Sequence, residues 1–260
     1  MKVEAKVKIE FGISLLSLFP WSWLLPGSAK RVVGWIKNIG YDFVYGLPIR
    51  GIGDEEEFGK WALPIKYRQR APINTRNVWA ALRQEKDDDG YRTGLDYWAR
   101  FSNYPKCEDV FEVMPGTSVA SRLTEAGDLL ELRPALGQDV DGIKQHLRDY
   151  RNSLVLDTSH AIEDRHQYDP NHSLPNPFGD TIEKRLDAVR ELSADVVQLR
   201  ISGFGQNDLQ VIRAFMSARD RSKSFDVVAD YVPESFMNPT DTCNRAHTFF
   251  EMMEGIKLLL

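Results

Sequence analysis

The 260-residue sequence contains only two cysteines, Cys107 and Cys243, and neither belongs to a CxxC pair. Two isolated thiols cannot build a disulfide framework, so we expect both to be reduced and the protein to be cytoplasmic. Glycine-rich phosphate loops of the GxGxxG or GxxxxGK[ST] type are missing after every predicted strand. Their absence argues against Rossmann and P-loop folds and predicts that no nucleotide cofactor is bound.

Long hydrophobic runs are also scarce. The longest, residues 11–27, is interrupted by Pro20 and Pro26 and is shorter than the roughly 20 residues that span a bilayer. The segment before it mixes lysines with glutamates, unlike the positive start of a signal peptide. The sequence therefore predicts neither a membrane partner nor a leader.

Positive charge is not in excess. Lys plus Arg is 33 and Asp plus Glu is 38, a formal net charge of -5, which argues against binding of nucleic acid by bulk phosphate attraction. Hydrophobic residues make up 42% and charged residues 27%, as in ordinary globular proteins. Repeats, low-complexity tracts and linkers are absent, so one domain over residues 1–260 is expected.

Strand-like apolar runs alternate with amphipathic helical patterns, clearly so in the second half. Such alternation predicts a parallel sheet, and the length suits a single (β/α)8 TIM barrel. Residues 85–127 show no pattern that assigns them a role. Strands are predicted at 5–14, 43–49, 65–74, 128–136, 153–161, 195–203 and 225–233, and helices at 28–40, 77–84, 139–150, 180–193, 207–220 and 243–260.

Polar side chains interrupt several of the predicted strands. A charge inside a barrel is costly unless it is paired or binds a ligand, and TIM-barrel sites lie at the C-terminal ends of the strands. We therefore expect one shared polar centre, drawn from Arg68, Arg70, Glu131, Arg133, Asp157, His160, Gln198, Arg200, Asp226 and Asp230.

From about residue 128 to residue 234, an ordered series of motifs resembles the xylose-isomerase-like sugar phosphate isomerases and epimerases. LLELRPAL is similar to their "lvlEn" strand, and SLVLDTSHA carries their DxxH at Asp157 and His160. VVQLRISG corresponds to their "HlkD" strand and FDVVADYVPE to their last strand. The resemblance implies the same TIM-barrel fold.

That family typically holds a divalent metal with Glu, Asp, His and Glu from four strands, and two of the carboxylates act as acid and base beside C2 and C3 of a sugar. Carried over by position, Glu131 and Asp157 match, Gln198 stands in place of the histidine, and Asp230 replaces the last glutamate. The resemblance thus implies Glu131 and Asp230 as the acid/base pair, with Asp157 and Gln198 completing a metal site.

Apart from Asp230, the departures from the family pattern lose an imidazole, and one of them gains an arginine. Arg70 stands where the family has an early histidine, and Met114 where it has another. The candidate ligands that remain are mostly oxygen atoms, which favours Mg²⁺ or Mn²⁺ over Zn²⁺ if a metal is bound at all. His160 is expected to bind substrate. We expect Arg70, Arg133 or Arg200 to supply the positive charge that holds an anionic group. In the loop 164–180, His166 or His172 is a candidate to replace a lost metal ligand.

Three hypotheses follow. The first is a sugar or sugar-acid isomerase or epimerase using carboxylate acid/base chemistry, with or without a metal. The second is a non-catalytic relative whose degenerate site, with carboxylates neutralised by arginines, binds an anionic small molecule or a protein. The third, a metal-dependent nuclease or lyase, is disfavoured by the five histidines and the acidic balance. The apolar residues Leu258–Leu260 are candidates for a contact in a homo-oligomer.

Overall fold

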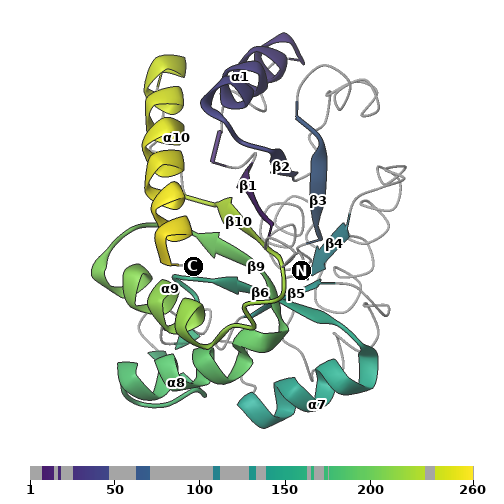
Figure 1. Cartoon of the computed structure of the whole chain (residues 1–260), viewed down its shortest axis with the longest axis vertical. Helices are drawn as coiled ribbons and strands as arrows, with labels where there is room; N and C mark the ends of the chain where they lie inside the picture. The colour runs from purple at the N-terminus through teal and green to yellow at the C-terminus, as the bar shows by residue number, and fades with distance from the viewer. Residues whose placement is uncertain are drawn as a thin grey trace, which may run out of the picture.

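Eight parallel strands close into a barrel in the computed structural model, in the spatial order β1-β10-β9-β6-β5-β4-β3-β2 (Figure 1). The structure describes residues 8–14, 17–18, 26–46, 63–70, 108–111, 129–132, 139–162, 165–166, 173–174, 176–231 and 238–259. The strands are β1 Ile9–Ser14, β2 Phe43–Gly46, β3 Ile65–Arg70, β4 Glu108–Phe111, β5 Leu129–Leu132, β6 Ser153–Asp157, β9 Val196–Ile201 and β10 Phe225–Ala229.

The described helices lie outside the strands (Figure 1). Their apolar faces pack on the outward side chains of the strands and form the larger of two buried apolar clusters. The helices are α1 Pro26–Ile39, α7 Val140–Tyr150, α8 Ile182–Leu192, α9 Gln206–Ala218 and α10 Pro239–Glu254, with short 3-10 turns η3 Ser193–Asp195 and η4 Gly255–Leu259. None of the described helices is long and apolar enough to cross a bilayer.

The predicted TIM-barrel fold is confirmed, with two local differences. Strand β4, EDVF, was not predicted because it is short and half acidic, and its neighbours β3 and β5 supply the context that makes it a strand. The predicted loop 164–180 contains a small antiparallel pair, β7 Arg165–His166 and β8 Ser173–Leu174. The predicted helix 77–84 lies outside the described residues.

A second apolar cluster fills the barrel interior, built from side chains that alternate with the outward ones. Gly12 makes room for it, because a Cβ placed there would lie 2.2 Å from the ring of Phe43. The Phe43 ring meets the Tyr67 ring edge-on at 5.5 Å between centroids. The cluster comprises Phe43, Tyr45, Tyr67, Leu129, Val155 and Val228.

Polar side chains occupy the N-terminal end of the barrel. The Lys66 Nζ lies 2.6 Å from Glu10 Oε2 and 2.6 Å from Asp226 Oδ2, and the Tyr67 hydroxyl also bonds to Asp226. The prediction that Asp226 belongs to the shared polar centre is therefore wrong. Asp226 is the second residue of β10, and its side chain faces the opposite end of the barrel from the strand C-termini.

Candidate functional site

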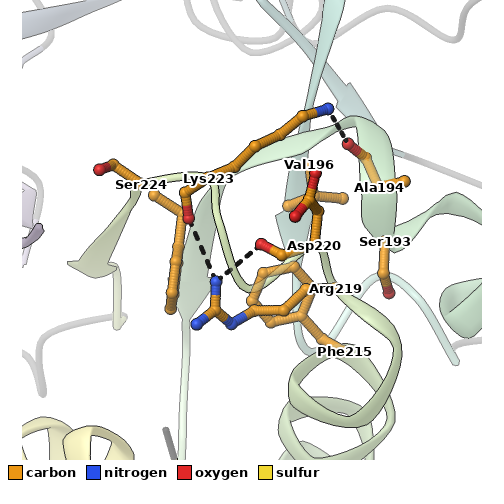
Figure 2. Close-up of a pocket in the computed structure, with 9 residues that line it drawn as sticks. Ser193, Ala194, Val196, Phe215, Arg219, Asp220, Lys223 and Ser224 are labelled. Carbon is orange, nitrogen blue, oxygen red and sulfur yellow. Dashed lines mark hydrogen bonds between the residues drawn. The ribbon is translucent and has the colours of Figure 1, made fainter. Parts of the chain in front are cut away.

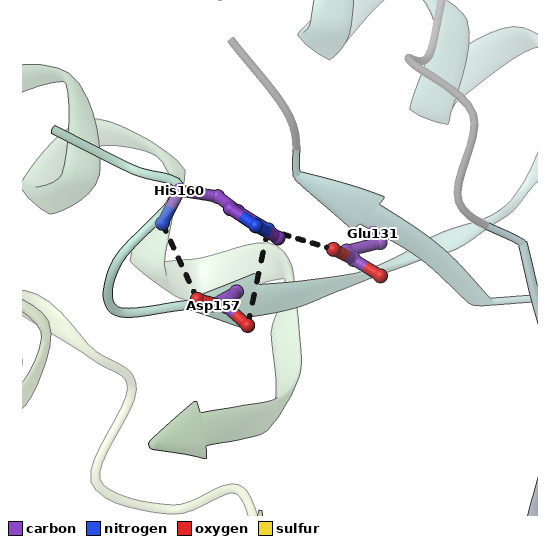
Figure 3. A group of neighbouring side chains, drawn as sticks. All are labelled: Glu131, Asp157 and His160. Atoms are coloured by element: carbon purple, nitrogen blue, oxygen red, sulfur yellow. Dashed lines mark hydrogen bonds and ion pairs between the residues drawn. The ribbon is translucent and has the colours of Figure 1, made fainter. Parts of the chain in front are cut away.

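Glu131, Asp157 and His160 meet at the C-terminal ends of β5 and β6 (Figure 3). The His160 Nδ1 lies 3.0 Å from Glu131 Oε1 and 3.8 Å from Asp157 Oδ2. The Glu131 side chain is fully buried and that of Asp157 is 4% exposed, whereas 29% of the His160 side chain is exposed. The imidazole is therefore the part of this trio that solvent and a ligand reach.

Asp157 holds the turn that carries His160. Its Oδ1 accepts hydrogen bonds from the Ser159 amide at 2.9 Å, the Ser159 hydroxyl at 2.7 Å and the His160 amide at 3.2 Å. The Ser202 hydroxyl, from the end of β9, adds a bond at 3.2 Å. A carboxylate with this many donors is a turn-building group, as short polar side chains after strands commonly are.

Arg200 lies at the centre of the barrel mouth and is 1% exposed. Its Nη1 is 2.7 Å from Glu131 Oε2 and 3.6 Å from Asp230 Oδ2, and its Nε donates to Gln198 Oε1 at 3.3 Å. Nη2 bonds to the Tyr45 hydroxyl, and the guanidinium lies 4.3 Å from the centroid of the Tyr45 ring. Side chains of four strands therefore share one guanidinium.

Asp230 follows β10 directly, and its backbone amide donates to the Ile201 carbonyl at 2.9 Å. Burial raises the pKa of the Asp230 carboxyl, while the Arg200 guanidinium opposes the rise and Asp157 adds to it. The Ser14 side chain hydrogen-bonds to the same carboxyl from the end of β1.

The structure thus places Glu131 and Asp157 near His160, and Glu131 and Asp230 near Arg200. Gln198 is also fully buried and bonds to Arg200. The side chains of the other predicted site residues, Asp226 apart, are not among those that the structure describes. Arg70 is the last residue of β3 and His166 lies in β7, both described for the backbone alone, while Arg133 and His172 lie outside the described residues.

The sequence analysis missed Tyr45, Ser14 and Ser202. Tyr45 reads as one more apolar strand residue, and only its hydroxyl contact with Arg200, 155 positions away, reveals a polar role. Ser14 and Ser202 end or follow apolar strands, which is the signal that could have found them, because side chains at those positions reach the barrel mouth.

The residues do not fit the divalent metal that the family resemblance implies. Among the described residues, the one group of acidic, histidine and cysteine side chains with donor atoms within 4.8 Å of one another is Glu131, Asp157 and His160. Asp230 is not in this group, and Glu131 already bonds to the fixed positive charge of Arg200. A cation seated there would share a carboxylate with a buried guanidinium, which Coulomb repulsion disfavours.

A hollow lined by Ser193, Phe215, Arg219 and Lys223 lies near the N-terminal ends of β9 and β10 (Figure 2). The Arg219 Nη1 donates to the carbonyls of Asp220 at 3.1 Å and Lys223 at 3.2 Å. These bonds hold the connection between α9 and β10. Because the hollow is at the opposite end from the strand C-termini, we assign it a structural role.

Comparison with solved structures gives an independent view of the fold. The chain aligns with D-allulose 3-epimerase from Methylomonas sp., solved in complex with D-allulose, at 12% identity and a TM-score of 0.54, over 95% of this chain and 97% of that one. The chain therefore shares the TIM-barrel fold of that epimerase. A xylose isomerase domain protein from Alicyclobacillus acidocaldarius subsp. acidocaldarius aligns at 9% identity and a TM-score of 0.47, over 96% and 99% of the two chains.

No family model matches the sequence. A search of curated proteins also found no match. The TIM-barrel fold favours a site at the strand C-termini, and the chemistry has to be argued from the residues gathered there.

Proposed function

We propose that the protein is an isomerase or epimerase that moves a proton at a carbon next to the carbonyl group of a small sugar or sugar acid. The observation that carries the proposal is that Arg200 contacts both Glu131 and Asp230 while Glu131 contacts His160, so that groups at the ends of three strands gather at one mouth of the barrel. Paired acid and base groups facing one pocket are what such proton transfer requires. The solved relative with D-allulose bound makes ketoses the first substrates to test.

Side-chain exposure suggests how the roles divide. His160 and Asp230, with 29% and 14% of their side chains exposed, are the groups that a substrate reaches. We assign His160 as the base and Asp230, whose pKa is raised by burial, as the acid. Glu131 is fully buried and acts through His160, because its contact with Nδ1 orients the imidazole ring.

Deuterium incorporation tests this proposal directly. Ketoses including D-allulose, and the matching sugar acids, are incubated with the protein in D2O and followed by NMR. We expect exchange at a carbon next to the carbonyl, lowered about 10²–10⁴-fold by His160→Gln and by Asp230→Asn. His247→Gln is the matched control, because His247 lies exposed on α10, and it should leave the exchange rate unchanged.

Glu131 has a separate readout, since its role is to position His160. Glu131→Gln keeps a hydrogen-bonding group but loses the charge, so we expect a lower exchange rate and a changed pH profile of that rate. A Glu131→Gln variant with the pH profile of the wild type would contradict the assigned role.

The alternative is a binding protein without catalysis, favoured by the buried ion pair between Arg200 and Glu131. A thermal-shift screen of the same compounds separates the two. Binding without any deuterium exchange would establish the binding function and refute the enzyme, whereas neither binding nor exchange across the panel would refute both.

A further inference from the structure

Arg200 contacts three of the four side chains that the family resemblance assigns to metal binding. Its Nη1 lies 2.7 Å from Glu131 and 3.6 Å from Asp230, and its Nε donates to Gln198. The fourth, Asp157, is instead surrounded by hydroxyl and amide donors. The guanidinium therefore occupies the electrostatic centre of the predicted ligand set.

This positive charge is permanent and held in place. An arginine side chain does not lose its proton in a protein, and Arg200 is 1% exposed. The face of the Tyr45 ring, 4.3 Å from the guanidinium, and the Tyr45 hydroxyl fix its orientation. A divalent ion bound to Glu131 would have to break this buried ion pair or lie beside it, and both are unfavourable.

We propose that Arg200 is the resident cation of this site and takes the place of the divalent metal, so that the protein works without a bound metal ion. The guanidinium supplies the positive charge that the gathered carboxylates need. It also explains why a glutamine is acceptable where the resemblance expects a histidine ligand, because Gln198 now has a guanidinium N–H to accept rather than a metal to coordinate.

Manganese binding tests the proposal without any assay of turnover. The protein is stripped with EDTA, dialysed and titrated with Mn²⁺, with free Mn²⁺ measured by electron paramagnetic resonance. We expect no stoichiometric binding by the wild type, and at least about tenfold tighter binding by Arg200→Met, which frees the carboxylates from the fixed charge. Arg200→Lys keeps a cation and should bind as weakly as the wild type.

Arg185→Met is the matched control. Arg185 is another buried arginine, 8% exposed, whose guanidinium donates to the carbonyls of Gly179 and Ile162. Its loss should lower stability without creating a manganese site. A folded Arg200→Met variant that gains no affinity for Mn²⁺ would overturn the proposal.

If Arg200→Met does not fold, the metal content of the wild type, compared with that of Glu131→Gln, still tests the proposal. One Mn²⁺ or Zn²⁺ bound per chain and released by Glu131→Gln would show that Arg200 does not replace the metal. A second arm rests on the proposed function: deuterium exchange should persist in EDTA, and exchange that needs added metal contradicts the inference. If no compound exchanges at all, the proposed function fails while the manganese titration still tests Arg200.

Discussion

At the scale of single residues, Gly12 lies where the packed barrel interior leaves no space for a side chain. A Cβ there would lie 2.2 Å from the Phe43 ring, which is buried and already packed against Tyr67. We expect Gly12→Ala to lower the free energy of unfolding by about 1–3 kcal/mol through overpacking, measured by urea denaturation.

Gly34, in the middle of α1, is the matched control, because no atom lies within 4 Å of its added Cβ. Gly34→Ala should raise the free energy of unfolding by about 0.5–1 kcal/mol, since alanine favours the helix. Equal effects of the two substitutions would show that Phe43 can move aside.

Two carboxylates, Glu10 and Asp226, contact Lys66, and their pKa values shift in opposite directions. The hydrogen bond from Lys66, with a second from Lys8, lowers the pKa of Glu10, whose side chain is 24% exposed. Burial instead raises the pKa of Asp226, even though Lys66 and Tyr67 oppose the rise. Desolvation thus dominates at the more buried Asp226 and raises its pKa, whereas the hydrogen bonds from lysine dominate at the more exposed Glu10 and lower its pKa.

Glu10 therefore predicts a pH dependence of stability. Because its pKa is lower in the folded protein, its contribution is present above the ordinary glutamate pKa of 4.5 and is lost as the pH falls through the lowered value. We expect Glu10→Gln to cost about 0.5–1 kcal/mol at neutral pH and nearly nothing in acid, measured by urea denaturation across pH. A cost that grows toward low pH would contradict the assignment.

At the scale of elements, the start of α9 supports the turn that carries His160. The Asp208 Oδ2 accepts the Gly205 amide at 3.1 Å, and its Oδ1 accepts the Thr158 hydroxyl at 2.6 Å. One carboxylate thus completes a helix N-terminus and holds the residue that follows Asp157. Stability of the helix and order of the site are coupled through this side chain.

We expect Asp208→Ala to lower the free energy of unfolding by about 1–2 kcal/mol, the usual cost of losing a group that caps a helix. It should also speed amide hydrogen exchange at residues 158–160, because their anchor is gone. Asp149→Ala, on the exposed side of α7, is the control and should change neither quantity. Unchanged exchange in Asp208→Ala would show that the turn is held by Asp157 alone.

At the scale of the whole molecule, polar clusters occupy the two ends of the barrel and an apolar layer separates them. Asp226 and Asp230 belong to opposite clusters and are four positions apart along β10, about 13 Å at 3.3 Å per residue. Leu129, Val155 and Val228 lie in the interior layer. The ends should therefore behave as independent units.

Double substitutions test this independence. The stability effects of Glu10→Gln and Glu131→Gln should add within about 0.5 kcal/mol, because the sites share no partner. Glu131→Gln and Asp230→Asn should instead deviate from additivity by about 1 kcal/mol or more, because both side chains contact Arg200. Coupling between the two ends of comparable size would mean that the interior transmits strain.

Periodicity along the chain was enough to predict most of the described elements, β4 excepted, although the last helix, α10, begins at Pro239 rather than at residue 243. The helix over 28–40 was predicted, and Gly40 does end it, with a φ of +122° that favours glycine; its start is two residues earlier, at Pro26. The helices α7, α8 and α9 agree within two residues at each end. Local patterns suffice here because these helices are amphipathic, and α7 and α8 also begin at polar caps, Asp139 and Thr181.

The sequence by itself determined that acidic side chains follow several parallel strands, and strand polarity alone then brings them to one mouth. Only the tertiary structure shows that Arg200 enters that mouth. The sequence does not distinguish Arg200 from Arg70 and Arg133, and the structure shows that Arg200 contacts two carboxylates and Tyr45, partners from strands far apart in the chain. Such contacts depend on barrel closure and register, which no local pattern encodes.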